Sequence, residues 1–264
     1  MCAAQLLFSS CEEVIDIDVE DIDQKIVIDG AITDANDGSR VVVSLTENVF
    51  SGSSNTKLSG ANIIVEDDIG NSETLRETER GKYSFTAMRG EFGKTYKLKV
   101  DHNGNEYTGI STLNEPMKID SIRFVQKYTY VIWGIEYSSY FPKVYLKNRE
   151  GVDEYCIIKI NDSSNKINRT TIVYQDKYAG DNQIVLEINN TGYQKDETIN
   201  IELLTIDKAA YEYFFQLNDL SEDSGIDVPD MLRINTYNPK TNLSNGALGY
   251  FYAYSYKKYS VVVQ

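Results

Sequence analysis

The sequence predicts an all-β protein: an N-terminal immunoglobulin-like or prealbumin-like β-sandwich, followed by a second β-rich domain with one short helix. Short segments rich in Val, Ile, Thr and Tyr recur along the chain, and these residue types favour pleated, half-buried strands. Clusters of Gly, Asn, Asp and Ser separate the segments at the short intervals that are typical of sandwiches. Helical periodicity is confined to one stretch after Asp207.

The N-terminal sandwich is expected over residues 25–115. Its strands are predicted where apolar or alternating segments occur, at residues 25–33, 41–46, 61–66, 82–85, 96–100 and 106–108. Residues 34–39 and 67–71 are rich in turn formers and are expected to connect strands. Asn103 and Gly104 form the dipeptide preferred in type I′ turns, which predicts a tight hairpin there.

The second domain is expected over residues 116–264, after a boundary at Pro116. It holds 17 of the 20 tyrosines, so the two parts differ in composition. Its strands are predicted at residues 119–124, 129–137, 154–161, 171–174, 183–188, 198–205, 246–256 and 259–263.

One helix is predicted in this second domain. Asp207 is expected to cap a helix over residues 208–220, because Asp is among the preferred N-cap residues. In that helix Ala210, Phe214 and Leu217 share one apolar face.

The first residues have the layout of a bacterial lipoprotein signal. The apolar run at residues 6–8 and two serines precede Cys11, and seven of the next twelve residues are acidic. Such a signal is cut before the cysteine, which is then acylated. Residues 1–10 are therefore interpreted as a residual signal peptide, and residues 11–24 as the acylated cysteine with an acidic tether. No run of 18 or more apolar residues predicts a membrane-spanning helix.

Charge and cysteine content exclude several classes of function. A formal net charge of −14 leaves no basic stripe that would neutralise phosphates, which argues against nucleic-acid binding. Of the three cysteines, Cys2 lies in the signal and Cys11 is the expected acylation site, so no internal disulfide is expected. Cys156 lies in an apolar strand pattern and is interpreted as a buried, inert thiol.

Residues for catalysis or metal binding are few. His102 is the only histidine and is expected at a hairpin tip, so a Ser-His-Asp triad has no support and the chain is not expected to be an enzyme. Cofactors are not expected, and no nucleotide-binding glycine motif is present. Acidic turn residues would suit Ca²⁺, although turn chemistry alone explains them: Asp34, Asp37, Asp67 and Asp68.

A row of tyrosines near the C-terminus is the main candidate for binding or packing. Tyr250, Tyr252, Tyr254 and Tyr256 alternate along a predicted strand and therefore share one face. Such a row serves as core, interface or ligand platform, and core or interdomain packing is the favoured interpretation.

Three segments together resemble a known family. They are the signal-like residues 8–13, the N-terminal blocks at residues 28–34, 43–46, 60–70 and 81–83, and the tail at residues 238–251. Their identity and order resemble the DUF4249 family of Bacteroidetes lipoproteins. The tail, Asn-Pro-Lys-Thr-Asn-Leu-Ser-Asn-Gly-Ala-Leu-Gly-Tyr-Phe, is the most specific part.

The resemblance implies an outer-membrane lipoprotein exposed at the cell surface. In such proteins acidic residues after the acylated cysteine resemble a surface-export signal, which Glu12 and Glu13 fit. Members of the family look like accessory partners of TonB-dependent receptors, which implies a ligand-binding or capping role in nutrient uptake. The alternative is a structural or adhesive surface protein without a small-molecule ligand. A tyrosine-lined pocket in the second domain would favour binding, whereas buried rings would favour the alternative.

Overall fold

The computed structural model describes residues 24–46, 56–162, 168–175, 183–189, 191–220 and 238–264. It confirms the all-β prediction, with one α-helix among the described residues. The strands are β1 (Ile26–Thr33), β2 (Arg40–Leu45), β3 (Asn62–Asp67), β4 (Ser72–Thr74), β5 (Arg76–Glu79), β6 (Lys82–Ser84), β7 (Thr95–His102), β8 (Asn105–Thr112), β9 (Lys118–Ile132), β10 (Ile135–Lys147), β11 (Tyr155–Asp162), β12 (Asn168–Gln175), β13 (Gln183–Glu187), β14 (Thr198–Ile206) and β15 (Leu248–Val262). The helix is α1 (Lys208–Leu220).

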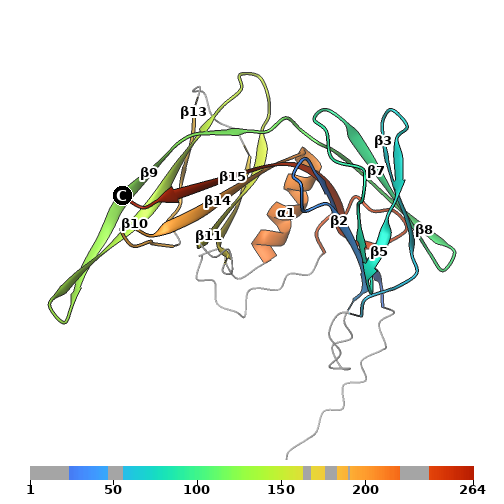
Figure 1. The fold of residues 1–264 in the computed structure, drawn as a ribbon, viewed down its shortest axis with the longest axis horizontal. Coiled ribbons are helices and arrows are strands. Elements are labelled where there is room, and N and C mark those ends of the chain that lie inside the picture. The colour runs from blue at the N-terminus through green and yellow to red at the C-terminus, as the bar shows by residue number, and fades with distance from the viewer. Residues whose placement is uncertain (1–23, 47–55, 163–167, 176–182, 190, 221–237) are drawn as a thin grey trace, which may run out of the picture.

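The N-terminal part is a β-sandwich of two sheets. Strands β1, β2, β6 and β5 form one end of a large sheet and face the smaller sheet β4-β3-β7-β8 (Figure 1). Alternate residues of the two sheets, such as Val41 and Leu98, are fully buried between them. The Asn-Gly turn lies between β7 and β8 as predicted, with φ of 52° at Asn103 and 80° at Gly104.

The second part repeats the two-layer arrangement with other strands. The large sheet continues as β12-β11-β14-β15 and packs on the sheet β13-β10-β9. Their shared core includes Val144, Ile158 and Ile201, all fully buried. Cys156 lies in this core with no exposed surface, as predicted, and burial raises the pKa of its thiol.

Strand β15 joins the two parts of the molecule. Its first half pairs in parallel with β1, in the register Val27 with Leu248, and its second half pairs antiparallel with β14. The two strands predicted at residues 246–256 and 259–263 are therefore one strand. The predicted division at residue 115 stays a prediction. The large sheet is continuous across both parts, and Phe251 of the tail lies in the N-terminal core.

The side chain of Asn242 links the tail before β15 to two strands. Its Oδ1 accepts a hydrogen bond from the Phe251 backbone N–H at 3.0 Å, and its Nδ2 donates to the Phe251 carbonyl at 2.7 Å. The same Nδ2 donates to the carbonyl of Ile110 on β8 at 2.8 Å. The amide therefore satisfies backbone groups of two strands that do not pair with each other there.

Helix α1 covers the outer face of the large sheet, below β15 in Figure 1, where Ala210 is fully buried. The predicted N-cap is confirmed: Asp207 Oδ1 accepts a hydrogen bond from the Ala210 N–H at 2.7 Å. The other carboxylate oxygen accepts hydrogen bonds from Ser111 Oγ at 2.5 Å and from the Thr112 N–H at 3.1 Å. The start of the helix is thereby tied to β8 of the N-terminal sandwich.

One predicted strand is wrong. Residues 129–137 do not form a single strand but the end of a long hairpin, in which β9 turns into β10 at Trp133 and Gly134. Both turn residues have positive φ, 52° and 78°, which is the geometry of a type I′ turn. Asn, Asp and Gly are preferred in that turn, so Trp133 is not recognisable as a turn residue from the sequence. The hairpin extends as a narrow ribbon to the lower left of Figure 1.

Candidate functional site

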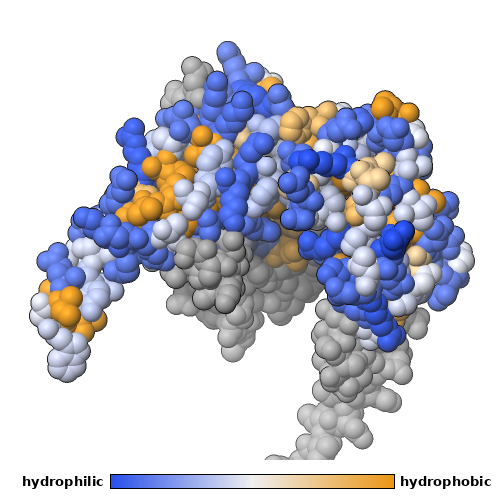
Figure 2. Space-filling view, viewed as in Figure 1, coloured by the Kyte–Doolittle hydropathy of each residue, from blue (hydrophilic) through white to orange (hydrophobic). Residues whose placement is uncertain are grey.

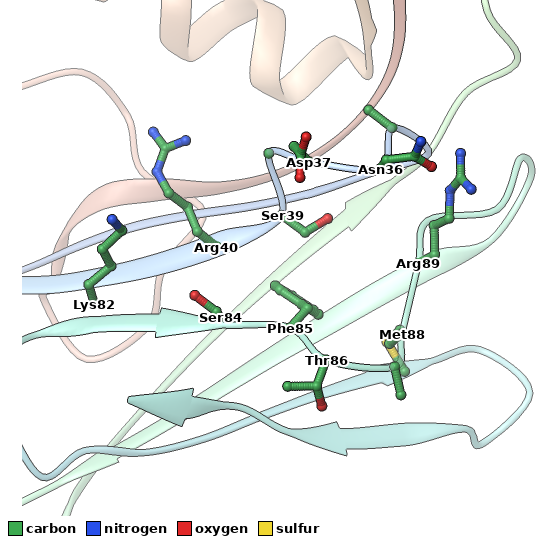
Figure 3. Close-up of a pocket in the computed structure, with 13 residues that line it drawn as sticks. Asn36, Asp37, Ser39, Arg40, Lys82, Ser84, Phe85, Thr86, Met88 and Arg89 are labelled. Atoms are coloured by element: carbon green, nitrogen blue, oxygen red, sulfur yellow. The ribbon is translucent and has the colours of Figure 1, made fainter. Parts of the chain in front are cut away.

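The N-terminal sandwich carries an open cavity of about 500 Å³ between the β1–β2 turn and the segment after β6 (Figure 3). Its lining is mostly polar and includes three cationic side chains, Arg40, Lys82 and Arg89, and one acidic side chain, Asp37. In Figure 3, Arg40 and Lys82 extend side by side from neighbouring strands, while Arg89 extends from the opposite end. The cavity thus concentrates positive charge in a chain of net charge −14.

The β1–β2 turn forms the first wall and is fixed by its own polar groups. The Asp34 carboxylate accepts a hydrogen bond from the Tyr256 N–H of β15 at 2.7 Å, and Ser39 Oγ accepts one from the Thr33 N–H at 3.0 Å. Gly38, at φ +115°, packs so closely that a Cβ there would lie 2.7 Å from the Tyr254 hydroxyl oxygen. The β1–β2 turn therefore packs against β15.

The segment after β6 forms the second wall and wraps around a carboxylate. Glu73 of β4 accepts hydrogen bonds from the backbone N–H groups of Thr86, Ala87 and Met88, the first at 2.6 Å. Burial raises the pKa of Glu73, but the hydrogen bonds from Met88 and Thr86 lower it more, so it lies below its usual value. The negative charge of Glu73 thus holds this wall in place.

The cations retain donors for a ligand. The Arg40 guanidinium has one long contact, 3.8 Å to Asp29, and Lys82 Nζ lies 3.2 Å from Glu79 at the exposed surface. Arg89 uses Nε to bind the Asp34 carbonyl oxygen at 2.5 Å, and that bond orients its guanidinium. Because guanidinium groups bind carboxylates and related anions through paired N–H donors, this arrangement suits an anionic group.

The predicted tyrosine row lies on the opposite side of β15 from the sandwich core and packs mainly against α1. Tyr250 is 3% exposed and stacks on Tyr213 of the helix, with ring centroids 4.5 Å apart. Tyr252 meets Phe214 edge-to-face at 4.9 Å. Tyr254 stacks on Tyr252 and Tyr256 is half-buried in the same layer. The structure therefore brings the four rings together in the layer between the sheet and the helix, and the Tyr254 hydroxyl lies against Gly38 of the cavity wall.

The acidic residues considered for Ca²⁺ lie in two separate turns. Asp34 and Asp37 belong to the β1–β2 turn, and Asp67 and Asp68 to the β3–β4 turn. The Asp67 carboxylate accepts hydrogen bonds from two backbone N–H groups and from the side chains of Asn71 and Lys94. Within the described ranges, no group of three or more His, Cys, Asp or Glu side chains is arranged to hold a metal ion.

Asp67 is expected to make stability depend on pH. Burial raises the pKa of its carboxyl, but hydrogen bonds from Asn71, Lys94 and Ile69 lower it more, from 3.8 to about 2. A lowered pKa stabilises the fold above the unfolded-state value, and the contribution is lost as pH falls from about 4 towards 2. Thermal melting of Asp67→Asn should show a lower Tm than the wild type at pH 7 and a smaller further decrease below pH 4.

Asp68→Asn is the matched control, since its side chain is exposed in the same turn. It should follow the wild-type pH profile. Equal slopes for wild type and Asp67→Asn below pH 4 would contradict the assignment of this pH dependence to Asp67.

The remaining predicted residues lie elsewhere. Cys11, Glu12 and Glu13 fall outside the described residues. His102 lies at the end of β7, beside the Asn-Gly turn, and does not line the cavity. In the part of the chain that the structure describes, no helix has the length and apolar character needed to cross a membrane.

The cationic residues of the cavity were not predicted from the sequence. Arg40 pairs with Ser84 across β2 and β6, but Arg89 follows in a segment without strand pairing. Their only sequence signal is that each is basic in an acidic chain.

Fold and cavity together define an all-β protein whose two parts share one sheet and whose N-terminal sandwich carries a cation-lined cavity. The chain matches the model of the family described as domain of unknown function (DUF4249) over residues 12–260, and it belongs to that family. No curated protein matches the chain.

Proposed function

We propose that this protein is a surface-exposed outer-membrane lipoprotein of Bacteroidetes that acts as an accessory ligand-binding or capping component of a TonB-dependent nutrient uptake system. Acylation at Cys11 and the acidic residues Glu12 and Glu13 would anchor it and direct it to the surface. The cation-lined cavity is the observation that carries the ligand-binding role. We assign no catalysis to the protein.

The chemistry of the cavity favours a ligand with carboxylate or sulfate groups. Arg40 and Lys82 present their charges on adjacent strands, and each has only weak or exposed acidic partners. A charge-assisted hydrogen bond contributes about 1.5–3 kcal/mol, so two such contacts give an anionic ligand a clear advantage over a neutral one.

Two measurements on one preparation test this proposal. The acylated, C-terminally tagged protein should co-purify stoichiometrically with a TonB-dependent receptor from native outer membranes in mild detergent. In calorimetry it should bind an acidic oligosaccharide more tightly than the uncharged counterpart of equal length. Arg40→Gln combined with Lys82→Gln should weaken acidic-ligand binding roughly 100-fold and leave co-purification unchanged.

Lys97→Gln is the charge-matched control, because Lys97 is exposed on β7 and does not line the cavity. It should bind the acidic ligand like the wild type. If all variants and the wild type bind both ligands equally, the cavity is not the ligand site. Recovery of the protein without a receptor, even after crosslinking, would refute the uptake role.

A structural or adhesive role is the second candidate. It is supported by the tyrosine row, because rings buried between β15 and α1 present no ligand platform. This role predicts neither a co-purifying receptor nor ligand binding in the cavity.

A further inference from the structure

The β9–β10 hairpin ends in a surface that its own fold leaves uncovered. Every residue from 125 to 136 is exposed, and residues 128–135 carry no charge. Trp133, the only tryptophan in the chain, is 97% exposed at the turn. Figure 2 shows the apolar side chains gathered at the end of this projecting ribbon. Exposed apolar groups concentrated in this way indicate an interaction surface.

The turn keeps a residue that its backbone geometry disfavours. Trp133 and Gly134 adopt nearly the same φ values as Asn103 and Gly104 in the β7–β8 turn. Asn tolerates this left-handed conformation, whereas a bulky side chain does so only at a conformational cost. A strained, fully exposed tryptophan at a hairpin tip therefore points to a role outside the fold.

The type of side chain changes along the axis of the hairpin. Aliphatic Val131, Ile132 and Ile135 lie next to the turn, and the next ring pair, Tyr130 and Tyr137, stacks at 5.5 Å one step back. Trp133 is at the tip, the aliphatic groups follow, and the tyrosine rings lie behind them, so the uncharged end combines apolar side chains with the amphipathic Trp and Tyr rings that are enriched at membrane–water interfaces.

The depth of this apolar end also fits a membrane interface. Charge begins at Glu136, which pairs with Val131 on the opposite face of the ribbon from the tyrosines. The turn with two residue pairs extends about 10 Å, at 3.3 Å per residue, which is close to the depth that interfacial segments reach.

The position of the hairpin places it near the membrane that would hold the acylated Cys11. In Figure 1 the hairpin tip and the end of β1 at which the described chain begins both lie toward the lower side of the molecule. Gln24 lies thirteen positions after Cys11, and a chain of that length spans at most about 45 Å. A protein tethered at Cys11 therefore keeps the hairpin near the same membrane.

We propose that residues 128–135 insert shallowly into the lipid bilayer to which the protein is tethered, with Trp133, Ile132 and Ile135 at the acyl boundary. The proposal rests on the anchoring part of the proposed function. Together with the acylated Cys11, the hairpin then fixes the orientation of the protein relative to the membrane.

The sole tryptophan makes insertion directly measurable. The full chain with an N-terminal histidine tag is held on phosphatidylcholine vesicles that contain a small fraction of nickel-chelating lipid, so tethering does not depend on native acylation. Relative to the protein without vesicles, Trp133 emission should shift to shorter wavelength and be protected from iodide. Lipids brominated on their acyl chains should quench it.

Two aspartate variants that keep the tryptophan provide the comparison. Ile135→Asp should reduce the bromolipid-quenched fraction roughly tenfold, because a charged side chain is unfavourable in the bilayer. Ile69→Asp, at an apolar residue of the β3–β4 turn that is also exposed, should behave like the wild type.

Two results would overturn the proposal. One is wild-type emission unchanged by vesicles and fully quenched by iodide. The other is a shift without bromolipid quenching that grows with protein density on the vesicles, which would mean that two copies pair through their hairpins. Failure of the uptake role would appear separately, in the co-purification from native membranes.

Discussion

Replacing Gly249 by alanine is expected to destabilise the protein by about 3–5 kcal/mol, enough to prevent folding of many domains. Gly249 has φ of +88°, and a Cβ there would lie 2.2 Å from the carbonyl oxygen of Ile28. The clashing atom belongs to the backbone of β1, the strand that pairs with β15 at this residue. Neither strand can move away without breaking the parallel ladder that joins the two parts of the molecule.

Gly246→Ala separates the steric clash from the strain of the left-handed backbone. Gly246 has φ of +71°, yet no atom lies within 4 Å of the position its Cβ would take. The substitution should therefore cost only about 1–2 kcal/mol. Urea unfolding followed by circular dichroism measures both variants, and equal losses would show that the contact with Ile28 is unimportant.

Phe251→Ala is expected to lower the free energy of unfolding by about 3–5 kcal/mol through loss of the ring and the cavity it leaves. Phe251 is fully buried in the N-terminal core. Two glycines make room for it: a Cβ on Gly30 would lie 3.0 Å from Phe251 Cδ2, and one on Gly109 would lie 3.1 Å from Phe251 Cβ. A site shaped so closely around one ring has little freedom to collapse.

Phe215→Ala is the matched control for this second substitution. Phe215 lies on α1, is 51% exposed, and contacts Tyr211 at a centroid distance of 5.6 Å. Its loss should cost about 1 kcal/mol or less, because half of the ring is already in water. If chemical denaturation gave the same loss for both variants, Phe251 would not be a core residue of the sandwich.

Local signals in the sequence predicted local structure well. The Asn103-Gly104 turn and the Asp207 cap depend on residues next to each other in the chain, and both are confirmed. The Trp133 turn was missed because that residue opposes the backbone geometry it adopts. The alternation that predicted one tyrosine face on β15 was sufficient to place those rings together, but it did not indicate that α1 covers them.

Features that depend on distant segments were not predictable in this way. The parallel pairing of β1 with β15 joins the two ends of the described chain. The residues of neither strand indicate which other strand it pairs with. The cavity has the same origin, since Arg40 and Arg89 come together only when the β1–β2 turn and the segment after β6 are both folded.

The pairing of β1 with β15 sets the order in which the protein can be completed during synthesis. The hydrogen bond from the Tyr256 N–H to Asp34 joins residues 222 positions apart, and Phe251 fills a core whose other members are made much earlier. The N-terminal sandwich therefore lacks a central side chain until nearly the whole sequence has left the ribosome. A nascent chain that lacks β15 therefore leaves the apolar site of Phe251 unfilled and exposed, because contacts between segments so distant in the sequence form late.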